Sequence, residues 1–354
     1  MRRTLLRDPV FIIVFTILMG LLLLSIGNTI FRDGQVDQFL NRYSDEGRLI
    51  GIPPLEPSKD QWLGTDRAGN DLFQMMIEGF KWTVGICATV ALGRMVLGLV
   101  VGIPLAFRGA RLNRIFKMLL DGFLILPISL LAMMMLFSSL LFADSTMVPP
   151  LVDRVTLQLT VFVLLGLPAV TLYLITEIRQ LLQQEFMIVA ETLGGSVWHR
   201  VRRHLWPHLV PTMVIVFMQQ FVQTLMLLIH LSLFGVFFGG TIYLFEGVMP
   251  TLFEWSSMFG YYFKQFTATT WMTSHMFLVP AIGLSMLVFL SNLLTSRLER
   301  AFRLRRQEAV VTEETMSQAE AAAASLANPF TCVHADGKFG LEGKRHNDDI
   351  VKNV

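Results

Sequence analysis

Six long apolar runs, separated by polar segments, constrain the fold of this chain more than any other feature of its sequence. They cover residues 9–26, 83–107, 118–142, 155–176, 213–237 and 276–294. A helix of about 18 residues is about 27 Å long, which is close to the thickness of the hydrocarbon core of a bilayer. Because 53% of the 354 residues are hydrophobic and only 16% are charged, we predict an all-α polytopic membrane protein with six transmembrane helices.

Basic residues predict how these helices are oriented. Near the membrane, the segments before the first run, between the second and third, between the fourth and fifth, and after the sixth hold 3, 4, 4 and 5 arginine or lysine residues. The alternate segments hold 6, 1 and 1, and the 6 are spread through a long, acid-rich stretch. The positive-inside rule therefore places both termini and the polar segment 185–211 in the cytoplasm.

The same pattern divides the chain into four regions. Residues 1–27 hold an N-terminal segment and the first transmembrane helix, residues 28–82 an extracytoplasmic loop, and residues 83–296 the transmembrane core. Residues 297–354 hold a basic juxtamembrane segment and a tail, of which we expect the first part to be helical and the rest disordered. A cleaved signal peptide ending near Ser25-Ile26-Gly27 is the rival interpretation of the first run, but the length of that run favours an uncleaved span.

The polar segment 185–211 predicts two short amphipathic helices with a break between them. Apolar residues at helical spacing define one face of each helix: Phe186, Val189, Ala190 and Leu193 in the first, and Val197, Val201 and Leu205 in the second. Gly194-Gly195 ends the first helix, because glycine adopts the left-handed conformation without a steric clash. Ser196 is suited to cap the second helix, and Pro207 and Pro211 separate it from the next apolar run. Such a pair indicates a docking surface; the alternative is an amphipathic loop on the membrane surface.

The sequence lacks the motifs of ATP binding, zinc-dependent hydrolysis and serine catalysis, GxxxxGK[ST], HExxH and GxSxG. We therefore predict that the chain is not an enzyme and binds no cofactor itself. His199, His204 and His208 lie among arginines that would oppose a cation, and the acidic residues of segment 62–71 lack the ligand spacing of an EF-hand, so we predict no metal site. Basic residues are not interleaved with aromatic ones, so we expect no nucleic acid.

Nine residues of the polar segment match, at the right spacing, the cytoplasmic EAA loop of binding-protein-dependent ABC importer permeases. They are Glu185, Ala190, Leu193, Gly194, Ser196, Arg200, Arg203, His204 and Pro207. Over about residues 1–305 the chain resembles in particular the C-type subunit of dipeptide, oligopeptide and nickel importers. Ile188, Val189 and Trp206 depart from the family pattern, and segment 62–71 resembles the family's LGTDxxGRD segment with Asn70 where arginine is usual.

This resemblance implies an ABC type I importer permease fold, in which loop 185–211 is a coupling helix that docks on an ATPase subunit. It implies as partners a second, B-type permease subunit, two cytoplasmic ATPase subunits that bind ATP and Mg²⁺, and an extracytoplasmic substrate-binding protein. The chain would lie in the inner (cytoplasmic) membrane of a bacterium, form half of a translocation pathway and import peptides. The alternatives are nickel chelates or another small solute as substrate, or a membrane scaffold that docks an ATPase without transport.

Polar side chains within the apolar runs are candidates for lining that pathway or the interface between subunits. Arg94 lies in the second run, and Gln219, Gln223 and His230 share a helix face in the fifth. Such residues are costly in lipid, so we expect them to face protein or a water-filled cavity. The alternative is that each of them forms a buried hydrogen bond between helices.

Overall fold

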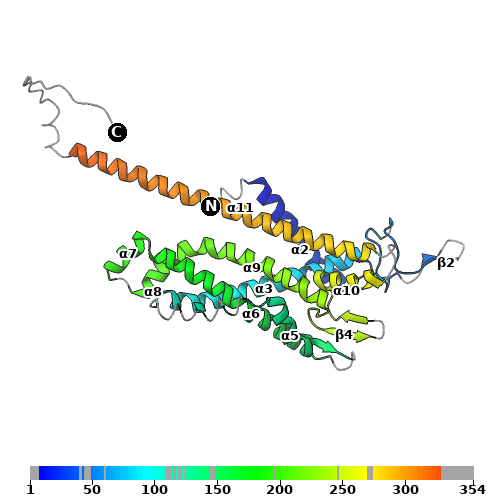
Figure 1. The fold of residues 1–354 in the computed structure, drawn as a ribbon. Helices are drawn as coiled ribbons and strands as arrows, with labels where there is room; N and C mark the ends of the chain where they lie inside the picture. Colours follow the sequence, from blue (N-terminus) through cyan, green and yellow to red (C-terminus); the bar gives the residue numbers. More distant parts are fainter. Residues whose placement is uncertain are drawn as a thin grey trace, which may run out of the picture. The chain divides into compact units, whose positions relative to one another are not determined.

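The structure is a computed structural model that describes residues 8–39, 42–43, 49–59, 61–108, 114, 117–118, 122, 125–143, 148–194, 196–244, 247–268 and 274–327. Its contacts divide the chain into two units, Met1–Ala301 and Phe302–Val354. The helices are α2 (Pro9–Arg32), α3 (Leu72–Ala106), α5 (Ile128–Leu140), α6 (Leu151–Leu182), α7 (Glu185–Thr192), α8 (Val197–Arg200), the π-helix η2 (Val201–Leu205), α9 (Trp206–Phe234), α10 (Trp255–Ala268) and α11 (Ser274–Ala327) (Figure 1).

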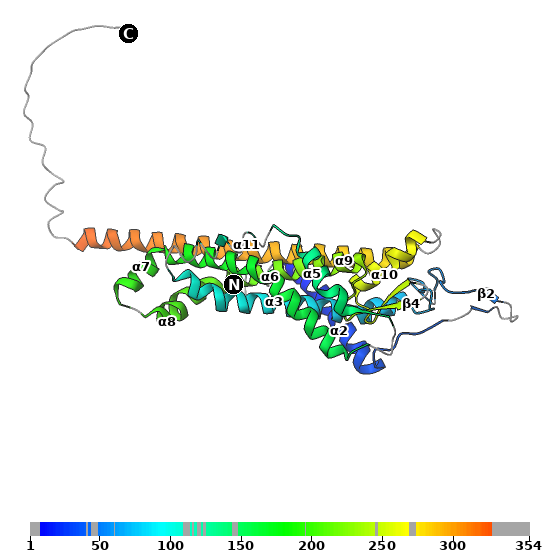
Figure 2. The same cartoon turned by 60° about the horizontal axis from the view of Figure 1, so that its bottom comes forward.

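Two small sheets accompany the helices. Strand β1 (Arg42–Tyr43) pairs antiparallel with β2 (Leu49–Gly51). Strand β4 (Thr241–Leu244) pairs in parallel with β3 (Leu141–Phe142) and antiparallel with β5 (Gly247–Pro250). In the first unit, α7 and α8 lie at one end of the helices, whereas α10 and β4 lie at the opposite end (Figures 1 and 2).

Long apolar helices confirm the predicted all-α polytopic membrane fold. Among the described residues, five helices are long and apolar enough to cross a membrane: Pro9–Arg32, Leu72–Ala106, Leu151–Leu182, Val197–Phe234 and Ser274–Leu304. Each covers all or nearly all of one predicted apolar run; α3 ends one residue before the end of run 83–107, and α9 ends three residues before the end of run 213–237. The remaining run, 118–142, contains the shorter apolar helix α5 of 13 residues.

The third run departs from its prediction at Pro127. The sequence predicts a helix over 118–142 that is kinked by this proline, but α5 begins only after it, and Pro127 is the extended N-cap residue with a ψ of 119°. Residues 125–126 form a turn and a bend. Proline disfavours the helical conformation in the residue before it, so no helix runs through Pro127, and α5 starts at Ile128 instead of bending at the proline. Most of residues 109–124 lie outside the described part of the chain.

The predicted break between the second short helix and the fifth span is absent. The chain is helical without interruption from α8 through η2 into α9, although Pro207 and Pro211 lie near the start of α9. The amide of Trp206 donates to the carbonyl of Val201, five residues earlier. This wider π turn directly precedes Pro207, which lacks an amide hydrogen and would crowd the carbonyl of an ordinary α-helical turn. The prolines therefore alter the register of one turn instead of ending the helix.

Close packing of α3 against α6 forms the centre of the first unit. The GxxxG pattern at Gly98 and Gly102 predicts such an approach. A Cβ atom added at Gly98 would lie 3.0 Å from Val170 and 3.2 Å from Leu174, and one at Gly102 would lie 3.6 Å from Leu174. The structure confirms the predicted close approach of the two helices at these glycines.

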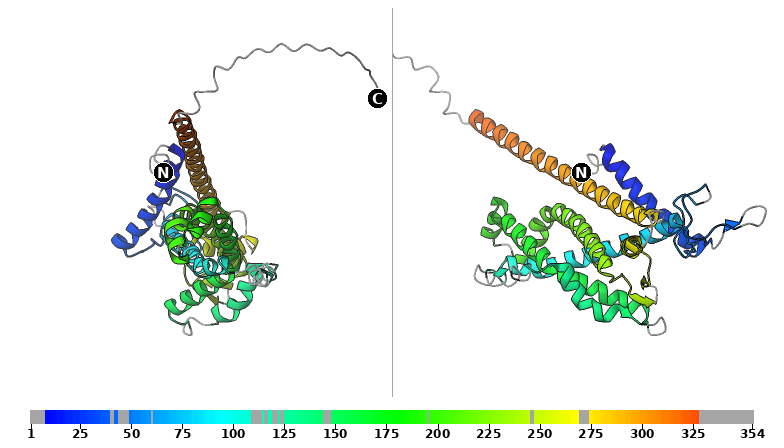
Figure 3. Two further views of the ribbon diagram at one scale, coloured as in Figure 1. Left: turned by 90° about the vertical axis from the view of Figure 1, so that its left-hand side faces the viewer. Right: turned by 45° about the vertical axis from the view of Figure 1, so that its right-hand side comes forward.

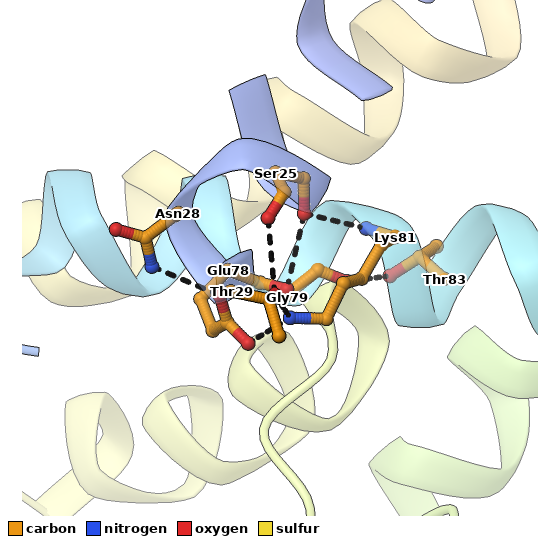
Figure 4. A network of polar contacts seen from close by, with 7 residues as sticks. All are labelled: Ser25, Asn28, Thr29, Glu78, Gly79, Lys81 and Thr83. Atoms are coloured by element: carbon orange, nitrogen blue, oxygen red, sulfur yellow. Dashed lines mark hydrogen bonds and ion pairs between the residues drawn. The ribbon is translucent and has the colours of Figure 1, made fainter. Parts of the chain in front are cut away.

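Helix α2 runs along the outside of the bundle and is attached to α3 by polar contacts (Figures 3 and 4). Ser25 is fully buried; its hydroxyl donates to the carbonyl of Glu78 and accepts from the amide of Lys81. Asn28 donates to Glu78 Oε2 at 2.9 Å, and Lys81 forms an ion pair with Glu78. Residues 25–29, which include the rival signal-cleavage site, are therefore held within a continuous helix against α3.

The end of the unit that contains α10 is closed by buried polar groups. Glu254 is fully buried and its carboxylate caps α10, accepting from the amides of Ser256 and Ser257 at 2.8 and 2.7 Å. The same carboxylate accepts from Thr83 Oγ1 on α3 at 3.2 Å. Each oxygen of this buried acid thus has several donors, which joins α10 to α3.

The loop that precedes α3 is attached to α10 through Asp66. This buried carboxylate accepts from the amide and side chain of Asn70 at 2.8 and 3.0 Å and from the Tyr262 hydroxyl at 3.3 Å. Burial, together with the neighbouring Asp66 charge, raises the pKa of the Tyr262 phenol well above its usual value. The hydroxyl therefore remains protonated and available as a donor at any physiological pH.

The second unit is described as far as Ala327, where α11 ends. The first part of the tail is therefore helical, as expected from the sequence. Residues 328–354, for which the sequence predicts disorder, lie outside the described residues.

Candidate functional site

Helix α7 begins at Glu185, as predicted, and packs inward through two residues at i and i+3. Met187 and Ala190 are buried, whereas Ile188 and Val189 are exposed. Of the face predicted from apolar spacing, Ala190 is buried and Phe186 is half-buried against the imidazole of His208, with ring centroids 4.7 Å apart. The buried residues of α7 are therefore Met187 and Ala190 and not the whole predicted apolar face, because spacing within a short helix does not reveal where its neighbours lie.

Gly194 forms the break after α7. Its φ of +76° lies in the left-handed region, as predicted, and its amide donates to the carbonyl of Glu191 at 2.9 Å. Among the described residues, no atom beyond Gly194 and its chain neighbours lies within 4 Å of the position that a Cβ would occupy. The requirement for glycine here comes from the backbone conformation alone, since the surrounding space is open in this chain. Gly195 lies outside the described residues.

Helix α8 starts at the predicted cap. The hydroxyl of Ser196 accepts from the amide of His199 at 3.3 Å, which stabilises the first turn. Of the predicted stripe, Val201 and Leu205 are buried against α3 and α6, in a cluster with Leu99 and Ile178. Val197 is exposed, so the stripe divides between the protein interior and the outer surface.

Several large apolar side chains of this loop are exposed. Leu193 is 82% exposed and Trp198 is 72% exposed. Ile188, Val189, Val197 and Trp206 are exposed as well. We call these six residues the exposed loop surface. An apolar surface of this kind, in a segment predicted to lie outside the bilayer, is typical of a site at which another macromolecule binds.

The remaining predicted loop residues point in different directions. Arg203 and Pro207 are exposed and His204 is half-buried, with its ring centroid 6.0 Å from that of His199. Arg200 differs because its side chain is only 11% exposed and pairs with Glu191 at 3.0 Å. Among the described residues, no group of three or more acidic, histidine or cysteine side chains is arranged to hold a metal ion.

Arg94 joins three helices in the middle of the bundle. It is 2% exposed; Nε and Nη2 donate to the carbonyl of Phe162 at 3.0 and 2.7 Å, and Nη1 donates to Gln220 Oε1 at 3.0 Å. Gly166 makes room for the guanidinium, because a Cβ there would overlap it. This side chain therefore forms the buried interhelical hydrogen bonds that the sequence left as the alternative to a pathway role.

The predicted polar face of α9 divides in a similar way. Gln219, Gln223 and His230 are exposed in this chain, whereas Gln220 is buried. Gln220 also donates to Gln223 Oε1 at 3.1 Å, which links the buried Arg94 to the exposed face. The partner of Arg94 was missed because two adjacent glutamines are indistinguishable until the packed face of the helix is known. A pathway role for the three exposed residues stays a prediction.

Comparison with known proteins gives two kinds of match. Residues 95–304 match the family described as "Binding-protein-dependent transport system inner membrane component". The oligopeptide transport system permease protein OppC of Bacillus subtilis is 26% identical over 216 residues, which are 61% of this chain and 63% of that protein. The dipeptide transport system permease protein DppC of the same organism is 21% identical over 180 residues, 51% of this chain and 52% of that protein.

Other relatives carry different names. The glutathione transport system permease protein GsiD of Pectobacterium atrosepticum is 22% identical over 245 residues, 69% of this chain and 73% of that protein. The nickel transport system permease protein NikC of Escherichia coli is 30% identical over 90 residues, 25% of this chain and 32% of that protein. The chain spans between half and two thirds of the length of OppC and DppC. The family match covers more than half of the chain, and the protein belongs to the inner membrane components of binding-protein-dependent transport systems.

Proposed function

We propose that this chain is a permease subunit of an ATP-driven importer and forms half of its translocation pathway. The observation that carries the proposal is the exposed loop surface, most of which lies on α7 and α8 and beside the left-handed glycine between them. An importer subunit without its own ATP site needs such a surface, because conformational change has to reach the membrane helices from separate ATPase subunits. The second half of the pathway would come from a B-type permease subunit.

In this proposal, loop 185–211 lies in the cytoplasm together with both termini and docks on an ATPase subunit. Leu193 and Trp198 would supply the apolar anchors of the contact. Arg203 and His204 would supply charge and hydrogen bonds at its edge. ATP and Mg²⁺ would bind to the two ATPase partners and not to this chain. An extracytoplasmic binding protein would deliver the solute to the opposite end.

Peptides are the proposed substrate class. The names of OppC and DppC refer to oligopeptide and dipeptide transport, and that of GsiD to glutathione, itself a tripeptide. The name of NikC refers to nickel, but the match to it covers only 25% of this chain. Nickel chelates and other small solutes are therefore the second choice, to be distinguished by direct uptake measurements.

The test is reconstitution of the chain with its partner subunits in vesicles and measurement of ATP-dependent uptake of radiolabelled trialanine. We expect uptake by the wild type and its loss in Gly194→Val, because a Cβ in the left-handed conformation costs about 1–2 kcal/mol and a β-branched side chain costs more. Gly194→Asn is the matched control, since asparagine tolerates this conformation, and it should retain most of the uptake.

Three outcomes would contradict parts of the proposal. Uptake by Gly194→Val at the wild-type level would contradict the proposed coupling role of the loop. Uptake of a nickel chelate but not of trialanine would support an importer and contradict the proposal that its substrates are peptides. ATP hydrolysis by the wild-type complex without movement of any tested solute would favour a scaffold that docks an ATPase.

A further inference from the structure

Arg200 occupies a joint between three elements of the chain. It is the last residue of α8, and its Nη1 lies 3.0 Å from Oε2 of Glu191, near the end of α7. Its guanidinium carbon lies 5.7 Å from the ring centroid of Phe107, the residue that caps the C-terminus of α3. The two other arginines of this loop, Arg202 and Arg203, are exposed. Arg200 alone among these three therefore points away from the outer surface of the loop.

Phe107 connects this joint to the C-terminal end of α3 and to the apolar cluster beside it. Phe107 packs against the same apolar cluster that holds Val201 and Leu205, and the next carbonyl, that of Arg108, accepts from Arg179 on α6 at 3.2 Å. α6 and α9 are covalently continuous with the loop, whereas α3 is not. A movement of the loop therefore reaches α3 only through non-covalent contacts, and Arg200 provides a directional one at the end of that helix.

We propose that Arg200 is a positioning residue that transmits movement of loop 185–211 to the C-terminal end of α3, instead of binding the ATPase itself. This inference rests on the proposed function of the loop. The chemistry of arginine suits the task, because its planar guanidinium stacks on an aromatic face while its edge donates to a carboxylate. Glu191 is 68% exposed, so the ion pair mainly orients the guanidinium, and the contact with Phe107 carries the movement.

The first experiment measures the coupling ratio, which is the amount of radiolabelled trialanine transported per ATP hydrolysed in reconstituted vesicles. For Arg200→Gln we expect pull-down of the ATPase subunits within about twofold of wild type, and a coupling ratio about tenfold lower. Arg200→Lys should recover only part of the ratio, because the ammonium keeps the charge but cannot stack in the same way. Arg202→Gln removes an exposed arginine from the same loop and should retain the wild-type ratio.

Two results of this experiment would overturn the proposal. A parallel loss of ATPase pull-down and uptake in Arg200→Gln would make Arg200 a docking contact. An unchanged coupling ratio would show that the joint carries no movement. A purely structural role is excluded by comparing the amount of assembled complex per vesicle, since a folding defect lowers that amount without changing the ratio.

The second experiment does not depend on transport and so separates failure of this inference from failure of the proposed function. Amide hydrogen exchange is measured on the full chain in detergent, at residues 185–194 and 103–108. We expect Arg200→Gln to speed exchange in both segments by about fivefold, and Arg202→Gln to leave both unchanged. Unchanged exchange in Arg200→Gln would contradict the proposal that Arg200 links the loop to α3, even if wild-type vesicles import trialanine. Faster exchange together with no trialanine uptake by the wild type would support the joint and reject peptide import.

Discussion

The two ends of the first unit differ in the kind of side chain that they bury or expose. At the α10 end, buried polar groups find partners within the chain: the Glu254 carboxylate has donors from α10 and α3, and Asp66 joins the loop before α3 to Tyr262. At the α7 and α8 end, apolar groups remain uncovered, with Leu193 and Trp198 mostly exposed. Buried polar groups at one end are satisfied by the chain itself, whereas in the proposed function the exposed apolar side chains at the other end are covered by a partner. Substitutions at the first end should therefore change stability, and those at the second should change assembly.

The largest effect is expected at the completed end. Glu254→Ala removes the acceptor for two amides and for the hydroxyls of Thr83, Ser256 and Ser257. Leaving buried donors without an acceptor should lower the free energy of unfolding by about 3 kcal/mol or more. The measurement is thermal unfolding of the purified chain in detergent, together with its level in the membrane.

Glu254→Gln is the matched control, because it retains one acceptor oxygen and nearly the same volume. Its loss of stability should be smaller than that of the alanine variant. Equal stability of Glu254→Ala and wild type would show that the buried hydrogen bonds of Glu254 do not stabilise this end of the unit.

Substitutions of the adjacent residues Gln219 and Gln220 test whether the hydrogen bonds of the buried Arg94 also stabilise the middle of the bundle. Gln220→Leu removes an acceptor from the buried Arg94 guanidinium, and we expect it to lower the free energy of unfolding by about 2 kcal/mol. Gln219→Leu changes an exposed side chain in the next position and should alter stability by less than about 0.5 kcal/mol. Unfolding of both variants in detergent, under one set of conditions, provides the comparison.

The same two variants separate stability from transport. If Gln219 lines the pathway, Gln219→Leu should lower trialanine uptake without lowering the amount of assembled complex. Equal destabilisation by both substitutions would mean that the packed face of α9 has been assigned incorrectly.

The next effect in size is expected at the exposed loop surface. Replacing Leu193 and Trp198 together by serine should leave the unfolding temperature unchanged, because both side chains are exposed in the chain alone. Pull-down of the ATPase subunits should fall by about tenfold, which corresponds to about 1.4 kcal/mol of binding free energy. The measurement is the ratio of ATPase to permease in complexes purified from detergent.

Trp62→Ser is the control for exposure itself. Trp62 is 71% exposed and Trp198 is 72% exposed, but Trp62 precedes α3 at the opposite end of that helix from loop 185–211. Its replacement should not affect ATPase pull-down. An equal loss in Trp62→Ser would show that exposed tryptophans support the complex in a general way, for example through the membrane interface.

The sequence predicted the features that depend on local chemistry. The left-handed backbone at Gly194, the cap at Ser196 and the close packing at Gly98 and Gly102 each follow from the properties of a residue and its immediate neighbours. The positions of the long apolar helices follow from the length of each run, which is a property of the segment alone.

Features that depend on distant partners were not predictable in this way. Glu254 accepts from Thr83, 171 residues earlier in the chain, and no local pattern indicates this contact. Periodicity identified an apolar face on α7 but not that Met187 would point inward, because that depends on where the neighbouring helices lie. The inward direction of Arg200 was missed for the same reason: an arginine in a basic loop is ordinarily solvated, and its contact with the ring of Phe107 is visible only in the packed structure.

The smallest effect is expected for Glu185, which lies in the first turn of α7 and is exposed. A carboxylate near the N-terminus of a helix is stabilising by about 0.3–1 kcal/mol, because it faces the positive end of the helix dipole. Glu185→Lys reverses this contribution and also presents a like charge to any basic group on the ATPase. We therefore expect ATPase pull-down to fall by about threefold, which is less than the loss expected for the Leu193 and Trp198 variant. Glu185→Gln keeps the shape without the charge and should lie between Glu185→Lys and the wild type. Because the side chain is solvated, the effect of the lysine variant should decrease at high salt if it arises from charge, and a defect that does not change with salt would place Glu185 in a packed contact instead.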